Sequence, residues 1–112
     1  MNYKSMLLTV SSAFVFIACA SPALAHNILC ACYANNDQTI TCEGGFSDGG
    51  SAKGLKVKVI SYKEDVLVDT KLDDSSTVTF KQPEGEFYIL IDGGPGHSAE
   101  IDYADIDGIT KK

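Results

Sequence analysis

The sequence predicts an all-β protein, a seven-stranded antiparallel β-sandwich that follows a cleaved export signal. Its apolar residues fall in short runs that alternate with polar residues, and this period of two is typical of half-buried strands. Clusters of Gly, Asn, Asp and Ser separate the runs at intervals of roughly ten residues, as in a β-sandwich. No window long enough for a helix has a 3.6-residue repeat with capping residues.

Residues 1–25 have the three parts of a secretory signal peptide. Lys4 gives the segment a positive start, residues 6–20 are uncharged and mostly apolar, and Ala23-Leu24-Ala25 is a small-x-small cleavage site. The apolar stretch is shorter than the about 20 residues that a membrane-spanning helix needs. We therefore expect cleavage before His26, export to the periplasm and no direct insertion of the mature protein into the membrane.

Two alternatives to this cleavage stay open. The residues Phe16-Ile17-Ala18-Cys19 loosely resemble a lipoprotein box with an atypical first residue, so lipidation of Cys19 would give a lipid-anchored protein. Alternatively, residues 1–25 stay attached as an uncleaved anchor.

A chain that begins at His26 has 87 of the 112 residues, which is one domain. At this size, folding hides roughly 60–65% of the unfolded surface, enough for a modest core. All 15 acidic residues lie in this part, against eight lysines and no arginine, so its net charge is −7. This charge argues against nucleic acid and anionic membranes as partners and is compatible with attraction of cations.

The first two predicted strands, residues 26–34 and 39–46, form a hairpin. The turn at residues 35–37 is Asn-Asn-Asp, and these short side chains tolerate left-handed backbone and bond to it. Gly44-Gly45 within the second strand predicts a bulge or the approach of another backbone. One face of the hairpin is apolar and comprises Ile28, Cys30, Cys32, Ile40, Cys42 and Phe46.

Five further strands are predicted at residues 55–62, 66–72, 77–81, 87–91 and 98–103. In the first of these, Leu55, Val57 and Val59 face inward because they alternate with lysines. The strand at 87–91 is the most apolar, so we expect it to be central and covered on both faces. The domain then spans residues 26–104, and the polar residues 105–112 are expected to be a flexible C-terminal tail.

Cleavage before His26 would create a potential metal chelate. The α-amine and Nδ1 of a terminal histidine close a six-membered ring on a divalent metal, and an amine pKa of about 7.7–8 makes deprotonation easy near neutral pH. His97, the second histidine, follows the glycine-rich loop 93–96, where a rigid strand end would present its side chain. For each, the plain alternative is an exposed histidine without a ligand, and imidazole suits nickel, cobalt, copper and zinc alike.

The mature chain has an odd number of cysteines, Cys30, Cys32 and Cys42. An odd count implies one bridge plus a free thiol, an intermolecular bridge, or metal ligation. Cys30 and Cys32, about 6.6 Å apart on one strand, are poor partners, whereas a cross-strand pair with Cys42 fits disulfide geometry. A three-residue loop would set Cys42 opposite Cys30, and a five-residue loop would set it opposite Cys32. Either bridge would stabilise the fold by up to about 3 kcal/mol.

Glu100 lies three residues after His97 and is a further candidate, as a ligand or as a partner that orients the imidazole. Cys30, Cys32 and Cys42 are the other candidates, because their alternative to a disulfide is a thiolate site for a soft metal. The sequence has no nucleophile elbow, phosphate-binding loop or two-histidine zinc motif. We therefore expect a protein that is not an enzyme.

Four elements of the sequence together resemble one family: Ala25-His26, Phe46-Ser47-Asp48-Gly49, Pro83-Glu84-Gly85-Glu86-Phe87 and Gly94-Pro95-Gly96-His97-Ser98-Ala99-Glu100. The family is that of small exported proteins that accompany nickel and cobalt uptake transporters of the energy-coupling-factor type. Their domain resembles the carboxypeptidase regulatory domain, a transthyretin-like sandwich related in architecture to Ig-like folds. The resemblance spans most of residues 25–103, and the three cysteines depart from the family pattern.

The resemblance implies an exported accessory protein that captures Ni²⁺ or Co²⁺ through His26 and His97 for a membrane uptake transporter. A non-metal β-sandwich that serves as a binding or structural module of the cell envelope is the main alternative. A second alternative is a copper-handling protein that uses the same histidines with a cysteine. Zinc also suits these ligands. Whether the two histidines are close in space decides the single-site hypothesis.

Overall fold

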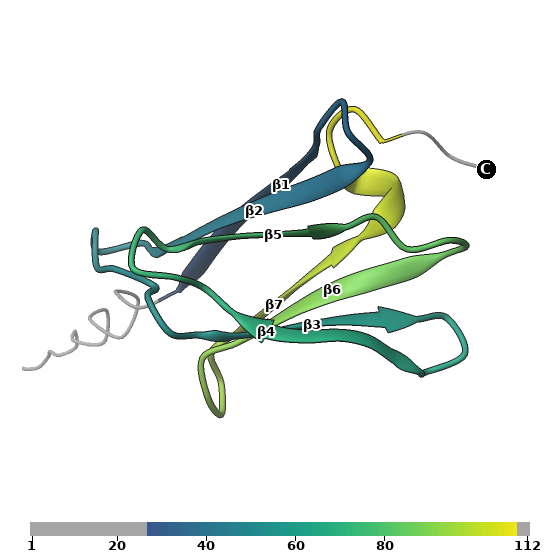
Figure 1. Cartoon of the computed structure of the whole chain (residues 1–112). Helices are drawn as coiled ribbons and strands as arrows, with labels where there is room; N and C mark the ends of the chain where they lie inside the picture. The colour runs from purple at the N-terminus through teal and green to yellow at the C-terminus, as the bar shows by residue number, and fades with distance from the viewer. Residues whose placement is uncertain (1–26, 110–112) are drawn as a thin grey trace, which may run out of the picture.

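The computed structural model describes residues 27–109, which form two stacked β-sheets (Figure 1). The strands are β1 (Ile28–Ala34), β2 (Thr39–Phe46), β3 (Lys56–Ser61), β4 (Val66–Lys71), β5 (Thr77–Lys81), β6 (Phe87–Asp92) and β7 (Ser98–Asp102). A short 3-10 helix, η3 (Tyr103–Asp105), follows β7. No helix within the described residues is long and apolar enough to cross a membrane.

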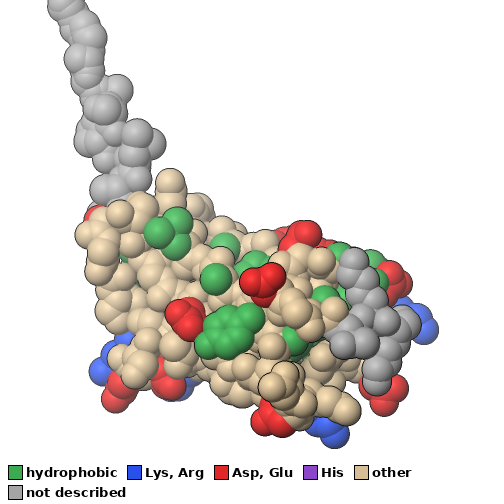
Figure 2. Space-filling model, turned by 90° about the horizontal axis from the view of Figure 1, so that it is seen from above, with side chains coloured by type: hydrophobic (Ala, Val, Ile, Leu, Met, Phe, Trp, Pro, Cys, Tyr) green, Lys and Arg blue, Asp and Glu red, His purple; other side chains and the backbone are tan. Residues whose placement is uncertain are grey.

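One sheet has the strand order β1-β2-β5 and the other the order β4-β3-β6-β7, and all strand pairs in both sheets are antiparallel. The prediction of an all-β protein with seven antiparallel strands is therefore confirmed. The predicted signal peptide 1–25 lies outside the described residues. Seen from above, the surface has small separate apolar areas with acidic side chains among them and basic ones near the rim (Figure 2).

The core is one apolar cluster to which both sheets contribute. Its fully buried side chains include Ile40 and Cys42 of one sheet and Val57, Val59, Phe87, Ile89 and Ile91 of the other. Alternate residues of each strand point into the cluster, which explains why the period-two pattern located the strands. β6 lies inside its sheet as expected, but Tyr88 and Leu90 on its outer face are half-buried, so the expectation that both faces are covered was wrong.

The described part of the expected flexible tail, residues 105–109, packs against the domain instead. Ile106 is only 3% exposed and belongs to the core cluster. Asp107 forms a parallel bridge with Tyr33, and the Ala34 N–H donates a hydrogen bond to the Asp107 carbonyl oxygen at 2.8 Å. The mostly polar composition of this segment predicted a tail, but Ile106 is buried and backbone hydrogen bonds pair the segment with the free edge of β1.

Gly44 and Gly45 do not form a bulge, because the pairing of β1 with β2 is continuous from Ile28 with Phe46 to Ala34 with Ile40. A Cβ atom on Gly44 would lie 2.8 Å from Leu72 Cδ1 and 3.3 Å from Ala52 Cβ. Glycine is therefore needed at 44 because buried side chains, rather than another backbone, pack against it.

Replacing Gly44 with valine should destabilise the protein by about 1–3 kcal/mol, because the added methyl groups overpack the site next to Leu72. Gly45→Val is the matched control, since a Cβ there would meet only the Gly50 carbonyl oxygen, at 3.9 Å. Urea unfolding of both variants measures the difference. Equal stabilities would contradict the proposed packing role of Gly44.

Candidate functional site

His97 lies in the tight loop between β6 and β7, and its side chain is exposed. Inside this loop the Gly93 N–H donates to the His97 carbonyl at 2.7 Å, and the His97 N–H donates to the Gly94 carbonyl at 2.9 Å. The Gly94 N–H also donates to Asp92 Oδ1 at 2.8 Å. Gly94 and Gly96 have φ values of 108° and 78°, which glycine adopts without strain. The glycines thus allow a closed loop that holds the backbone of His97 in place.

The start of β1 lies against this same loop. A Cβ atom on Gly93 would be 3.0 Å from Ile28 Cδ1 and 3.5 Å from His97 Cβ. The distance between Ile28 Cδ1 and His97 Cβ therefore cannot exceed the sum of these two distances. Asn27 is fixed to the end of β2, because its carbonyl accepts a bond from the Ser47 N–H at 2.8 Å. Figure 1 shows the start of β1 and the β6–β7 loop at the same end of the domain.

His26 itself lies outside the described residues. What the structure establishes is that Ile28, at the start of β1, lies beside the loop that carries His97. Sequence reasoning selected His97 because of its glycine loop, but it had no means of placing the loop next to the start of β1.

Glu100 lies in β7, where it pairs with Leu90 of β6. The pKa of Tyr88 is raised chiefly by burial, next by the Glu64 carboxylate and least by the negative charge of Glu100. Glu100 also lines a cleft together with Cys30 and Cys32. The structure therefore groups Glu100 with the cysteines, and its suggested role beside His97 stays a prediction.

The predicted cross-strand disulfide joins Cys32 to Cys42, which face each other in the β1–β2 register. This is the pairing expected for the five-residue loop. Cys30 is free and half-buried, and its Sγ lies 4.0 Å from Cys32 Sγ. Burial raises the pKa of the Cys30 thiol to about 11, because the thiolate would lose its hydration.

A cleft of about 480 Å³ opens along the boundary between β1 and β7. Its lining combines sulfur atoms with carboxylates: Cys30, Ala31, Cys32, Glu100, Ile101, Asp105 and Asp107. Asp105 and Asp107 come from the segment that the sequence had placed in a flexible tail. For that reason, sequence reasoning missed this combination of residues.

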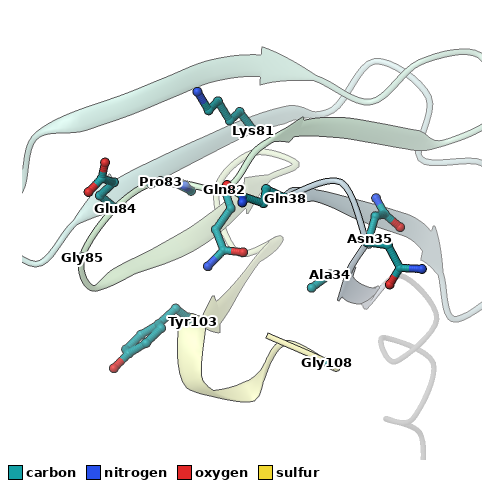
Figure 3. Close-up of a pocket in the computed structure, with 11 residues that line it drawn as sticks. Ala34, Asn35, Gln38, Lys81, Gln82, Pro83, Glu84, Gly85, Tyr103 and Gly108 are labelled. Carbon is teal, nitrogen blue, oxygen red and sulfur yellow. The ribbon is translucent and has the colours of Figure 1, made fainter. Parts of the chain in front are cut away.

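A second, polar pocket of about 530 Å³ lies at the other end of β1 (Figure 3). Residues of two turns line it, Ala34, Asn35, Asn36 and Gln38 from one and residues 81–85 from the other, together with Tyr103 and Gly108. Figure 3 shows the Gln82 side chain lying between the two turns and Tyr103. Its amide-rich lining comes from turns in which short polar residues shape the backbone, and turns of this kind carry no functional signal of their own in a sequence.

Three tyrosines at that end of the four-stranded sheet donate hydrogen bonds to carboxylates: Tyr62 to Asp102, Tyr88 to Glu64 and Tyr103 to Glu86. The bond to Asp102 is the largest of the effects that raise the pKa of Tyr62 to about 12. The bond between Tyr62 and Asp102 thus joins the end of β3 to β7 across β6, and the other two bonds join the residues around β6 to the adjoining turn and to η3.

With the Cys32–Cys42 disulfide closed, no group of three or more His, Cys, Asp or Glu residues within the described residues 27–109 is arranged to hold a metal ion. Comparisons of the chain with protein-family models, curated proteins and solved structures found no match.

The raised pKa of Cys30 predicts slow alkylation by iodoacetamide at neutral pH. Because the thiolate is the nucleophile, its rate should rise about tenfold per pH unit from about pH 8 to pH 10. A thiol with the ordinary pKa of 9.0 would level off over this range. Mass spectrometry of the labelled protein measures the rate, with Cys30→Ser as the unlabelled control. A plateau near pH 9 in the folded protein would contradict the prediction.

Proposed function

We propose that this protein is an exported accessory protein that binds Ni²⁺ or Co²⁺ and passes it to a membrane uptake transporter. The observation that carries the proposal is the contact between the start of β1 and the His97 loop. Because two residues span at most about 7 Å, a chain that starts at His26 would have its first residue within reach of His97. The two-sheet arrangement is compatible with the transthyretin-like sandwich that the family resemblance implies.

The proposed ligands are three nitrogens: the α-amine and imidazole of His26 and the imidazole of His97. The first two would form the chelate, and the third would come from a loop whose backbone is already fixed by hydrogen bonds. A fixed loop lowers the entropy lost when the metal binds. The exposure of His97 leaves the ion accessible to a receiving protein, which an accessory protein requires.

A non-metal binding module of the cell envelope is the second candidate. It is favoured by the edge strand β4, on which Val66 and Leu67 are 53% and 43% exposed. Exposed apolar residues on a free strand edge are typical of sites where another chain adds a strand. This candidate predicts no affinity for nickel or cobalt in the processed protein.

The chelate hypothesis is tested by isothermal titration of the exported protein with Ni²⁺ and Co²⁺ after mass spectrometry has shown that it begins at His26. Inserting one alanine between Ala25 and His26, so that the processed chain begins with Ala, removes the amine from the chelate ring. This insertion and His97→Ala should each weaken binding by at least about tenfold.

Glu100→Gln tests the further candidate ligand, which lines the cysteine cleft. It should leave the affinity unchanged if the site consists of the two histidines. Equal affinity of the alanine-extended and normal proteins would refute the chelate, and absence of binding by both would favour the envelope module.

A further inference from the structure

We propose a second metal site in this protein: when the Cys32–Cys42 disulfide is reduced, Cys30, Cys32 and Cys42 together bind one monovalent copper ion. The site is separate from His97 and does not depend on the function proposed above. Its ligands come from β1 and β2 alone, and its opening is the cleft between β1 and β7.

The three sulfur atoms are already close together. Cys30 Sγ lies 4.0 Å from Cys32 Sγ, and Cys32 Sγ is bonded to that of Cys42. Three sulfurs around one ion in a plane, each at about 2.3 Å from it, are about 4.0 Å from one another. The distance between the sulfurs of Cys30 and Cys32 thus already has the value that the site requires. Loss of the disulfide bond lets the Cys42 sulfur move to a similar distance from the other two.

The hairpin keeps the sulfurs together without the disulfide. Cys30 and Cys32 are two residues apart in β1 and share its inner face, and Cys42 lies directly opposite Cys32. Seven consecutive residue pairs join β1 to β2, and Ile40 of β2 is fully buried in the core. These interactions fix the register independently of the sulfur atoms.

The surroundings favour a soft cation. Thiolate ligands select monovalent copper over the ions that prefer nitrogen and oxygen, such as nickel and cobalt. Burial of Cys30 makes a lone thiolate unfavourable, and a bound cation offsets that cost. Glu100, Asp105 and Asp107 line the same cleft, and their negative charge raises the local concentration of cations.

The oxidation state of the protein controls the site. A dithiol reductant transfers two electrons and two protons to the Cys32–Cys42 disulfide, and its own two thiols become a disulfide. The three protein thiols then release three protons as their sulfurs bind one Cu⁺. With the disulfide closed, two of the three ligands are bonded to each other, and only Cys30 remains as a thiol.

The exported protein, processed to begin at His26, is reduced with a phosphine under anaerobic conditions and titrated with Cu⁺ in competition with bicinchoninate. We expect one Cu⁺ per chain in the reduced protein and none in the oxidised protein. Cys30→Ser keeps the Cys32–Cys42 pair but removes one ligand, so its reduced form should bind Cu⁺ at least about 100-fold more weakly. Near-ultraviolet circular dichroism reports whether the reduced protein keeps its native packing.

Equal Cu⁺ affinity of the wild type and Cys30→Ser, or of the oxidised and reduced wild type, would overturn the proposal. Loss of native packing on reduction would also overturn it, because the site requires the β1–β2 register. A reduced wild type that prefers Zn²⁺ over Cu⁺ would refute the choice of metal. His97→Ala should bind Cu⁺ like the wild type while losing Ni²⁺ affinity, so failure of one proposal is distinguishable from failure of the other.

Discussion

The pairing of β1 with β2 is the constraint on which both candidate sites depend. Because side chains alternate along a strand, a shift of one residue would turn Ile28, Cys30 and Cys32 from the core to the solvent. The observed register places Cys32 opposite Cys42 and Ile28 opposite Phe46. Ile28 then reaches Gly93 in the β6–β7 loop, so the same register that permits the disulfide also brings the start of the chain to His97.

The turn between the two strands sets this register, and here the sequence was least informative. Five residues, 35–39, separate the last paired residues, and Gln38 rather than an Asn or Asp adopts the left-handed conformation, with φ 66°. The Asn35 side chain instead donates to the hydroxyls of Thr39 and Thr41, each at 2.9 Å. General preferences for turn residues predicted a turn here but could not choose its length, because side-chain bonds to the following strand decided it.

The strands themselves were predictable from the sequence. β2, with its bounds Thr39–Phe46, and β5, at Thr77–Lys81, coincide with the predicted ranges, because polar clusters end each apolar run sharply. The segment after Asp105 was not predictable in this way, since Ile106 is a single apolar residue among polar ones. One buried side chain and two backbone bonds give no periodic signal, yet they are enough to hold a short segment against an edge strand.

The candidate sites show the same division between local and long-range information. His97 and the three cysteines were selected from local sequence, because a glycine loop and an odd cysteine count each carry their own chemistry. Which groups meet depends on β1 lying beside β7, a contact between strands of different sheets that no pattern in either strand reveals. That contact gives the Cys30 cleft its carboxylates, and the adjacent β6–β7 loop meets Ile28. β1 therefore connects the two proposed sites: a divalent cation would bind to nitrogen ligands at the exposed start of the strand, and a soft monovalent cation would bind to sulfur ligands where the strand becomes buried.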